Sequence, residues 1–174
     1  MTRSWVKKPL TVILAIIVLG IGIDQLTKAL ALANLTTGNP IPILSDIFQL
    51  HLLRNPGASF SMGTSMTVVF SVLALVALIA ISIFVIPKVD SMVWAVAVGL
   101  GMAGIAGNFI DRIIQPPGPF QGYVTDFFAL KYFAVFNVAD VLLTSAAVLI
   151  VVVTLFLKID LRGHRQTRGT TETE

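Results

Sequence analysis

The sequence of 174 residues contains no cysteine, only two histidines and few charged residues. Without cysteine the chain cannot form disulfide bonds, thiolate metal sites or a cysteine nucleophile. Charged residues make up 12% of the chain, about half the fraction in a typical soluble domain. Hydrophobic residues make up 56%, and the mean hydropathy is +0.90. This composition predicts an integral membrane protein.

Four long apolar runs occupy residues 9–23, 66–86, 91–110 and 133–157. A helix needs about 20 apolar residues to cross the hydrocarbon core, and each run has that length or can be extended to it. We therefore expect an all-α membrane protein with a single domain and four transmembrane helices, at approximately residues 9–30, 66–87, 91–111 and 134–157. The short loop 87–90 predicts that the second and third helices are antiparallel neighbours.

Two longer segments separate the helices on one side of the membrane. Residues 34–65 carry prolines and glycines between β-prone pieces such as 47–53, which predicts a small extracytoplasmic β platform. In the second segment, the proline-rich stretch 115–119 cannot lie inside a helix, and the apolar stretch 123–128 is expected to be extended or half inserted. The polar tail, residues 162–174, is expected to be disordered in the cytoplasm.

Lysine and arginine are distributed unevenly along the chain. Eight of the twelve lie at the termini and in the second loop, and four lie on the opposite side. This bias predicts that both termini are cytoplasmic and that the two larger loops lie outside. The basic residues bracket apolar helices and form no basic stripe on a folded face, so we expect no nucleic-acid partner.

Polar residues recur at helical spacing near the outer ends of three predicted helices, at Asp24 and Lys28, at Gly104, Asn108 and Arg112, and at Asn137 and Asp140. Taken alone, Asp24 and Lys28 would be an ordinary surface pair at a helix end. Asp140 is unusual because it lies inside an otherwise uncharged run. The seventeen residues that follow it would span about 26 Å as a helix, which places it just beneath the outer face of the bilayer.

A second acid, Asp126, lies upstream of Asp140, and the two predict an aspartyl dyad. Two carboxylates that share a site cannot both ionise readily, so one activates water and the other donates a proton. Spacing alone leaves both Asp111 and Asp126 open as the partner of Asp140. We favour Asp126, because Asp111 abuts Arg112 and is expected to stay ionised in a structural pair. No zinc-binding His-Glu-x-x-His motif occurs, and we expect no metal or cofactor.

A non-enzymatic alternative is a small proton-coupled carrier that uses Asp24, Asp126 and Asp140 as a relay. Such a carrier needs polar groups at both faces and at the midplane. The inner halves of all four predicted helices are almost wholly apolar, which favours chemistry approached from one side.

Five short motifs, in the same order, resemble those of the lipoprotein signal peptidases (signal peptidase II), a family of bacterial membrane aspartyl peptidases. They are Asp24-Gln25-Leu26-Thr27-Lys28, Arg54-Asn55-Pro56-Gly57-Ala58-Ser59-Phe60-Ser61, Gly104 with Gly107-Asn108-Phe109-Ile110-Asp111-Arg112, Val124-Thr125-Asp126-Phe127 and Phe136-Asn137-Val138-Ala139-Asp140. Each motif is weak alone, but the ordered set is highly specific.

This resemblance implies an endopeptidase that removes signal peptides from diacylglyceryl-modified prolipoproteins, cleaving before the lipidated cysteine. It implies a monomer in the bacterial cytoplasmic membrane, in contact with membrane lipids, with its active site near the outer face. The catalytic dyad of the family corresponds to Asp126 and Asp140. The positions that shape the site or hold substrate correspond to Asp24, Lys28, Asn55, Gly57, Gly104, Asn108, Arg112 and Asn137.

Overall fold

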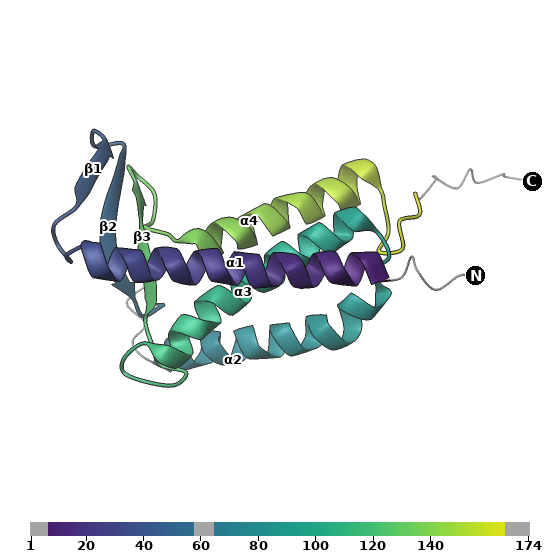
Figure 1. The fold of residues 1–174 in the computed structure, drawn as a ribbon, viewed down its shortest axis with the longest axis horizontal. Coiled ribbons are helices and arrows are strands. Elements are labelled where there is room, and N and C mark those ends of the chain that lie inside the picture. The colour runs from purple at the N-terminus through teal and green to yellow at the C-terminus, as the bar shows by residue number, and fades with distance from the viewer. Residues whose placement is uncertain (1–6, 58–64, 166–174) are drawn as a thin grey trace, which may run out of the picture.

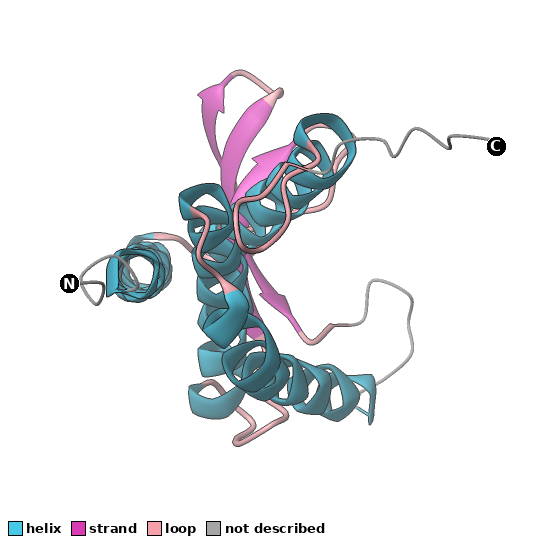
Figure 2. Cartoon of the chain, turned by 90° about the vertical axis from the view of Figure 1, so that its right-hand side faces the viewer, coloured by secondary structure: helices cyan, strands magenta, loops and turns pink. Residues whose placement is uncertain are grey.

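The computed structural model describes residues 7–57 and 65–165 of the chain. Its main elements are four α-helices, with a small sheet at one end and both termini at the other (Figure 1). Helix α3 packs against the other three helices. Figure 2 looks along the helices from the end that carries the termini, with the strands behind them. The helices are α1 (Lys7–Asn34), α2 (Ser65–Ala80), α3 (Met92–Ile114) and α4 (Val138–Val151).

Two of the helices continue in other helical forms. A π-helical turn, η1 (Ile81–Val85), and a 3-10 turn, η2 (Ile86–Lys88), extend α2, and the π-helical turn η3 (Val152–Leu157) extends α4. Pro87 lies within η2, where its missing N–H and its ring end the helix. With these extensions, four helices are long and apolar enough to cross a membrane: Lys8–Asn34, Met66–Lys88, Met92–Ile114 and Val138–Leu157. The prediction of four transmembrane helices is confirmed.

The fourth helix begins at Val138, and the predicted start at residue 134 is wrong. The chain before it is extended, because Phe136 exchanges backbone hydrogen bonds with Phe128. The expected disordered tail also does not begin at Arg162, since the backbone N–H groups of Arg162 and His164 donate to the Asp160 carboxylate in a turn. Residues 166–174 lie outside the described part of the chain.

The predicted platform is an antiparallel sheet with the strand order β1 (Ile41–Leu44), β2 (Phe48–Asn55) and β3 (Val124–Leu130). Strand β3 comes from the apolar stretch that was expected to be extended or half inserted. It pairs with β2 so that Asp126 lies opposite Leu53, and Val124 lies opposite Asn55. The sheet therefore joins the two longer segments between the helices and brings Asp126 to the ends of the helices that lie away from residues 7 and 165.

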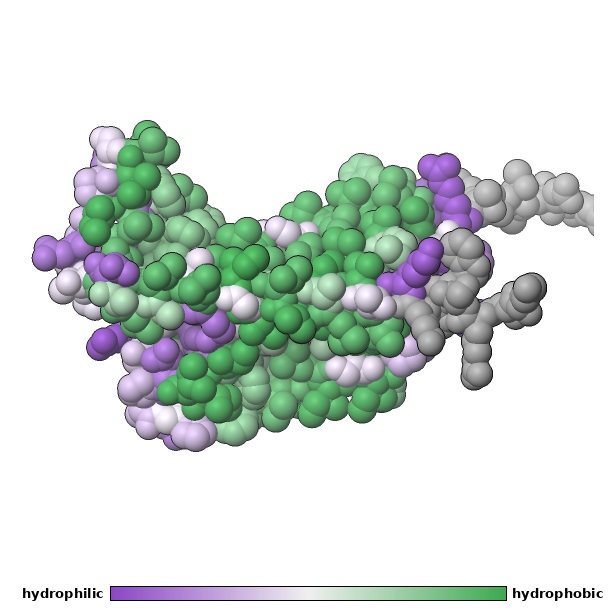
Figure 3. Space-filling model, in the orientation of Figure 1, coloured by the Kyte–Doolittle hydropathy of each residue, from purple (hydrophilic) through white to green (hydrophobic). Residues whose placement is uncertain are grey.

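The surface of the helices is apolar, whereas several polar side chains are buried. Hydrophobic residues cover the helical part of the molecule, and hydrophilic residues gather at its two ends (Figure 3). Side chains such as Val18, Leu155 and Phe156 are more than 60% exposed, as expected for groups that face lipid. Asp24, Lys28, Asp111, Asp126 and Asn137 are at most 2% exposed. The fold thus turns its apolar surface outward at the helices and encloses charge at one end.

Close packing of α3 against α4 depends on one glycine in particular. A Cβ atom at Gly104 would lie 2.6 Å from the carbonyl oxygen of Ala139 and 2.8 Å from the backbone nitrogen of Leu143. Both of these atoms belong to the α4 backbone and cannot rotate away. We expect Gly104→Ala to lower the free energy of unfolding by about 1–3 kcal/mol, because the two helices must separate.

The control for this prediction is Gly101→Ala in the same helix. There a Cβ atom would meet only the Ala146 Cβ at 3.5 Å, an ordinary contact. Alanine also has a higher helix propensity than glycine, by up to about 1 kcal/mol. Thermal unfolding in detergent should therefore show Gly101→Ala at or above the wild-type midpoint and Gly104→Ala below it. Equal midpoints for the two variants would contradict the packing argument.

Candidate active site

Strand β3 carries Asp126, and the neighbouring strand supplies its first hydrogen-bond donor. The Asn55 side-chain amide donates to Asp126 Oδ2 at 2.8 Å. Asn55 Oδ1 in turn accepts the backbone N–H of Gly57 at 2.8 Å, which turns the amide nitrogen toward the carboxylate. Gly57 has a φ of 85°, a backbone conformation that glycine adopts without strain. The turn after β2 therefore orients the group that binds Asp126.

The chain returns from β3 so that Asn137 lies beside Asp126. Phe128 donates its backbone N–H to the Phe136 carbonyl at 2.8 Å, and Phe136 donates back at 2.9 Å. This pairing carries the next residue to the strand, where Asn137 Nδ2 donates to Asp126 Oδ1 at 2.6 Å. Both oxygens of the buried Asp126 carboxylate thus accept an amide hydrogen.

Asn137 also begins helix α4 and connects the two aspartates. Its side chain accepts the N–H of Asp140 at 3.1 Å, and the Asp140 carboxylate accepts the backbone N–H of Asn137 at 3.1 Å, which forms a capping box. The other Asp140 oxygen accepts from Asn108 Nδ2 of α3 at 2.8 Å. Asn137 therefore contacts both Asp126 and Asp140, and Asp140 is the more exposed of the two.

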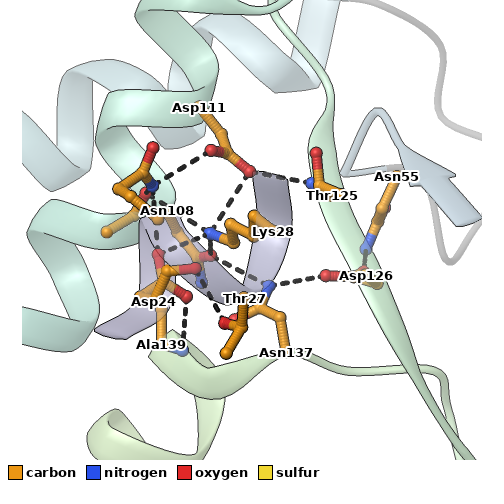
Figure 4. Close-up of polar contacts among 12 residues, drawn as sticks. Asp24, Thr27, Lys28, Asn55, Asn108, Asp111, Thr125, Asp126, Asn137 and Ala139 are labelled. Atoms are coloured by element: carbon orange, nitrogen blue, oxygen red, sulfur yellow. Dashed lines mark hydrogen bonds and ion pairs between the residues drawn. The ribbon is translucent and has the colours of Figure 1, made fainter. Parts of the chain in front are cut away.

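Next to these residues lie four side chains that we call the Lys28 cluster: the buried Asp24, Lys28 and Asp111, which Figure 4 shows close together, and the half-buried Gln25. The Lys28 ammonium lies 2.9 Å from Asp24 Oδ2 and 3.2 Å from Asp111 Oδ2. Gln25 Nε2 donates to both carboxylates, at 3.1 and 3.2 Å. With two carboxylates and one ammonium, the cluster has a net charge of one negative when all three groups are ionised.

The Lys28 cluster fixes the groups that contact Asp126 and Asp140. Lys28 Nζ donates to Asn108 Oδ1 at 3.0 Å, and Asn137 donates to the same oxygen at 3.1 Å. The amide oxygen of Asn108 is therefore occupied, and its nitrogen faces Asp140. Asp24 Oδ1 accepts the N–H of Ala139 in the first turn of α4 at 2.9 Å. The cluster thus positions the helix terminus that carries Asp140.

A groove of about 310 Å³ runs from the site into the apolar part of the molecule. Helices α2, α3 and α4 line it, with Phe70, Leu73 and Leu143 at its apolar end and Asn108 and Arg112 at its polar end. Arg112 lies against the Phe70 ring, 5.9 Å from the ring centroid. Its Nη1 atom is buried and has no hydrogen-bond partner within the described residues. The groove therefore has apolar walls and a guanidinium group at its polar end.

Burial changes the acidity of Asp126. The pKa of this carboxyl is raised to about 6, mainly because the group is removed from water and also because Asp140 lies nearby, whereas the amide donors of Asn55 and Asn137 oppose the rise. Asp126 consequently holds its proton to a higher pH than an ordinary aspartate. Such a group can donate a proton in a site where a second carboxylate remains ionised.

The structure brings the predicted residues into one region, with two differences from expectation. Asp24 and Lys28 are not a surface pair but are fully enclosed. Asp111 pairs with Lys28 and not with Arg112, and it also accepts the N–H of Thr125 at 2.8 Å. Asp111 is therefore a structural partner of Lys28, while the capping residue Asn137 joins Asp126 to Asp140. The end of the second motif, residues 58–61, lies outside the described chain.

Two residues of this region were not predicted individually. Gln25 bridges the two carboxylates of the Lys28 cluster, and its position three residues before Lys28 on the same helix could have indicated this. Thr125 is fully buried, and its hydroxyl has no hydrogen-bond partner within the described residues. No pattern in the sequence distinguishes Thr125 from an ordinary strand residue.

Comparison with known proteins identifies the family of the chain. The family described as Signal peptidase (SPase) II matches residues 16–156. A lipoprotein signal peptidase of Rhodococcus jostii is 42% identical over 132 residues, which are 76% of this chain and 66% of that protein. One of Leifsonia xyli subsp. xyli is 39% identical over 157 residues, covering 89% of this chain and 72% of that protein.

A solved structure described as a bacterial membrane enzyme, determined by the in meso method at 1.9 Å resolution, superimposes with a TM-score of 0.74. It is 28% identical in sequence, and the alignment covers 83% of this chain and 92% of that one. The family match covers most of the chain and includes both aspartates, and the fold agrees with that of a membrane enzyme. The chain therefore belongs to the signal peptidase II family.

Proposed function

We propose that this protein is an aspartic endopeptidase that removes signal peptides from diacylglyceryl-modified prolipoproteins, cleaving before the lipidated cysteine. The observation that carries the proposal is the pair Asp126 and Asp140, joined through Asn137 at the end of a groove that enters the apolar region. Family membership supports the same class of substrate. The chain spans only 66% of the length of the Rhodococcus relative. The activity proposed for this chain is therefore argued from the residues of its own candidate site.

Asp140 and Asp126 have different roles in this proposal. Asp140 stands in the first turn of α4, where the helix dipole and two N–H donors stabilise a negative charge, so it is the base. It removes a proton from water while the oxygen of that water attacks the scissile carbonyl carbon. Asp126, whose pKa is raised by burial, gives its proton to the carbonyl oxygen.

Collapse of the resulting diol restores both groups. Asp140 transfers its proton to the leaving nitrogen as the C–N bond breaks, and Asp126 recovers a proton from a diol hydroxyl as the carbonyl forms again. Water is consumed, and a carboxylic acid and an amine are released. The reaction so written requires only the two carboxyl groups and water, with the pair titrating as a unit.

The groove accounts for a substrate that remains in the bilayer. Its apolar walls suit the hydrophobic segment of a signal peptide, and its polar end leads to Asn108, which contacts Asp140. Arg112 Nη1 at that end has no hydrogen-bond partner among the residues that the structure describes, and it can donate to a peptide carbonyl of the substrate. A peptide held in this way presents its scissile bond at the membrane interface.

The orientation in the membrane follows from the charge bias. Eight lysines and arginines lie at the termini and the second loop, against four on the sheet side, so we propose that both termini are cytoplasmic and that the site faces outward. We also propose that the protein acts as a monomer, because one chain supplies Asp126 and Asp140 together with their side-chain donors Asn55, Asn108 and Asn137, so a second copy is not needed to complete the pair.

The carrier alternative lacks support. Asp24 is bound to Lys28 and to the α4 backbone, and the acidic residues within the described helices, Asp24, Asp111 and Asp140, lie at their sheet end. A proton relay would need acids across the bilayer.

The experiment uses purified full-length protein and a synthetic precursor whose cysteine carries diacylglycerol. Mass spectrometry should find cleavage immediately before that cysteine, and the same peptide without lipid should be cleaved far more slowly. Cleavage at another bond, or equal rates for the two peptides, would refute the proposal.

Acidity of the dyad provides a separate prediction. If Asp126 donates the proton, kcat/KM is high while Asp126 is protonated and falls as the pH rises through its pKa of about 6. Asn55 stabilises the ionised form, so Asn55→Leu should raise this pKa and move the alkaline limb to higher pH. Asn34→Leu, at an exposed position of α1, is the matched control and should leave the limb in place. A shift to lower pH in Asn55→Leu would exclude Asp126 as the acid.

A further inference from the structure

A second pocket, of about 400 Å³, lies at the opposite end of the helices from the candidate site. It is formed where the end of η3, the start of α3 and the C-terminal turn meet. Lys88, Trp94, Lys158, Asp160 and Arg162 line it. Its volume is within the range of about 300–1,000 Å³ found for sites that bind small molecules. The proposed peptidase reaction uses none of these residues.

Hydrogen bonds hold the walls of this pocket in place. The Leu161 carbonyl accepts the backbone N–H groups of Asp90 and Ser91, at 2.9 and 3.2 Å. The Trp94 indole N–H donates to the Ile159 carbonyl at 3.0 Å. These hydrogen bonds fix the segment after η3 against the beginning of α3. The shape of the pocket is therefore determined by the fold.

The pocket has an excess of positive charge. The side chains of Lys88, Lys158 and Arg162 are exposed, and none of them forms an ion pair within residues 7–57 and 65–165. Asp160 is the acidic residue of the lining. Its carboxylate already accepts the backbone N–H groups of Arg162 and His164, at 3.0 and 2.7 Å. Three cations against one occupied carboxylate favour an anionic ligand.

The pocket also adjoins surface that faces hydrocarbon. Lys158 directly follows η3, where Leu155 and Phe156 are 63% and 73% exposed, and Thr154 of the same turn lines the pocket. A ligand with an anionic head can therefore extend apolar chains along η3 without leaving the bilayer. Trp94 lies at this boundary, the depth at which tryptophan is enriched in membrane proteins.

We propose that this pocket binds the phosphate of an anionic phospholipid. The cationic side chains would contact the phosphate, and the acyl chains would lie on the exposed face of η3. Basic pockets between transmembrane helices at the cytoplasmic side have the properties needed for such headgroups. A zwitterionic lipid fits less well, because its ammonium group would lie among the three cations. Assignment of the site to the inner leaflet rests on the proposed orientation of the chain.

The test measures lipid binding to purified full-length protein in detergent by native mass spectrometry, with phosphatidylglycerol and phosphatidylcholine as the probes. Wild type should retain phosphatidylglycerol in preference to phosphatidylcholine. In the pocket variant Lys158→Gln/Arg162→Gln, affinity for phosphatidylglycerol should fall at least about tenfold. The matched control, Lys8→Gln/Arg165→Gln, removes two charges from the same end outside the pocket and should bind as wild type does.

Each other outcome would overturn the proposal. Equal loss in the two variants would indicate unspecific charge attraction, and no preference in wild type would mean that no such site exists. Glycerol phosphate without acyl chains is added at the same concentration as the lipid. If it displaces phosphatidylglycerol, the pocket is a site for soluble phosphates and the lipid assignment is wrong.

A second measurement locates the lipid. In a Trp5→Phe background, Trp94 is the remaining tryptophan, and phosphatidylglycerol with brominated acyl chains should quench its fluorescence more than brominated phosphatidylcholine does. Equal quenching by the two lipids would place the bound lipid elsewhere. Both measurements are independent of cleavage, so a failure of the peptidase proposal and a failure of the lipid proposal can be told apart.

Discussion

Asp126→Asn and Asp140→Asn are each expected to lower kcat/KM for a lipidated precursor by on the order of 10³-fold. Asparagine is close to aspartate in size, but it can neither accept a proton from water nor deliver one to the carbonyl oxygen. In the proposed mechanism, each substitution therefore removes one of the two proton transfers on which bond cleavage depends. Gel mobility of a reporter lipoprotein in cells, and cleavage rates of the synthetic precursor in vitro, measure the loss.

The matched control for this prediction is Asp46→Asn. Asp46 is exposed beside the sheet, where it pairs with Lys131, so the Asp46→Asn variant should retain wild-type processing. Thermal unfolding of all variants must show that Asp126→Asn and Asp140→Asn remain folded. Normal processing by either of these two would disprove the dyad.

Asp111→Asn resolves the ambiguity that sequence spacing leaves. Asp111 is bound to Lys28, Gln25 and the Thr125 backbone, so this variant should lose stability while its folded fraction keeps most of its activity. A loss equal to that of Asp140→Asn, in protein that is still folded, would make Asp111 the catalytic partner.

The transmembrane helices could be predicted from sequence because their signal is simple. A run of apolar residues of sufficient length has few alternatives in a bilayer, and all four helices were located in this way. The start of α4 was missed because residues 133–136 are apolar as well. Their extended conformation depends on hydrogen bonds between Phe136 and Phe128, and such pairing is a tertiary contact that hydropathy does not encode.

The sequence predicted which residues lie in the candidate site better than it predicted which of them contact one another. Helical spacing indicated that Asn108 and Asp140 would face one level of the membrane, and they form a hydrogen bond of 2.8 Å. Spacing could not indicate that Lys28 of α1 reaches across to Asp111 of α3, because the choice between Arg112 and Lys28 as its partner depends on helix rotation. Arg112 is the neighbour of Asp111 in the sequence, but helix packing makes Lys28 the partner of Asp111 in the structure.

Lys28→Met is expected to lower the free energy of unfolding by about 3–5 kcal/mol, the largest stability effect among the substitutions considered. The side chain is 2% exposed and is the cation that contacts two carboxylates that are also enclosed, so its loss leaves Asp24 and Asp111 buried without a counter-charge. It also removes one of the two donors to Asn108 Oδ1 and leaves only Asn137 to hold the Asn108 amide nitrogen toward Asp140, so processing should fall as well. Thermal unfolding in detergent measures the first effect, and precursor cleavage measures the second.

The control for Lys28→Met is the same substitution in a surface pair. Lys131 contacts Asp46 with side chains that are 40% and 61% exposed, so Lys131→Met should cost no more than about 1 kcal/mol. The triple variant Lys28→Met/Asp24→Asn/Asp111→Asn has no charge left in the cluster. If the large effect at Lys28 arises from unpaired buried charge, this triple variant should recover part of the lost stability. If it arises from packing alone, the triple variant should be less stable than Lys28→Met. The sign of the difference in stability between the triple variant and Lys28→Met therefore decides whether the charge of Lys28 is what permits Asp24 and Asp111 to be buried.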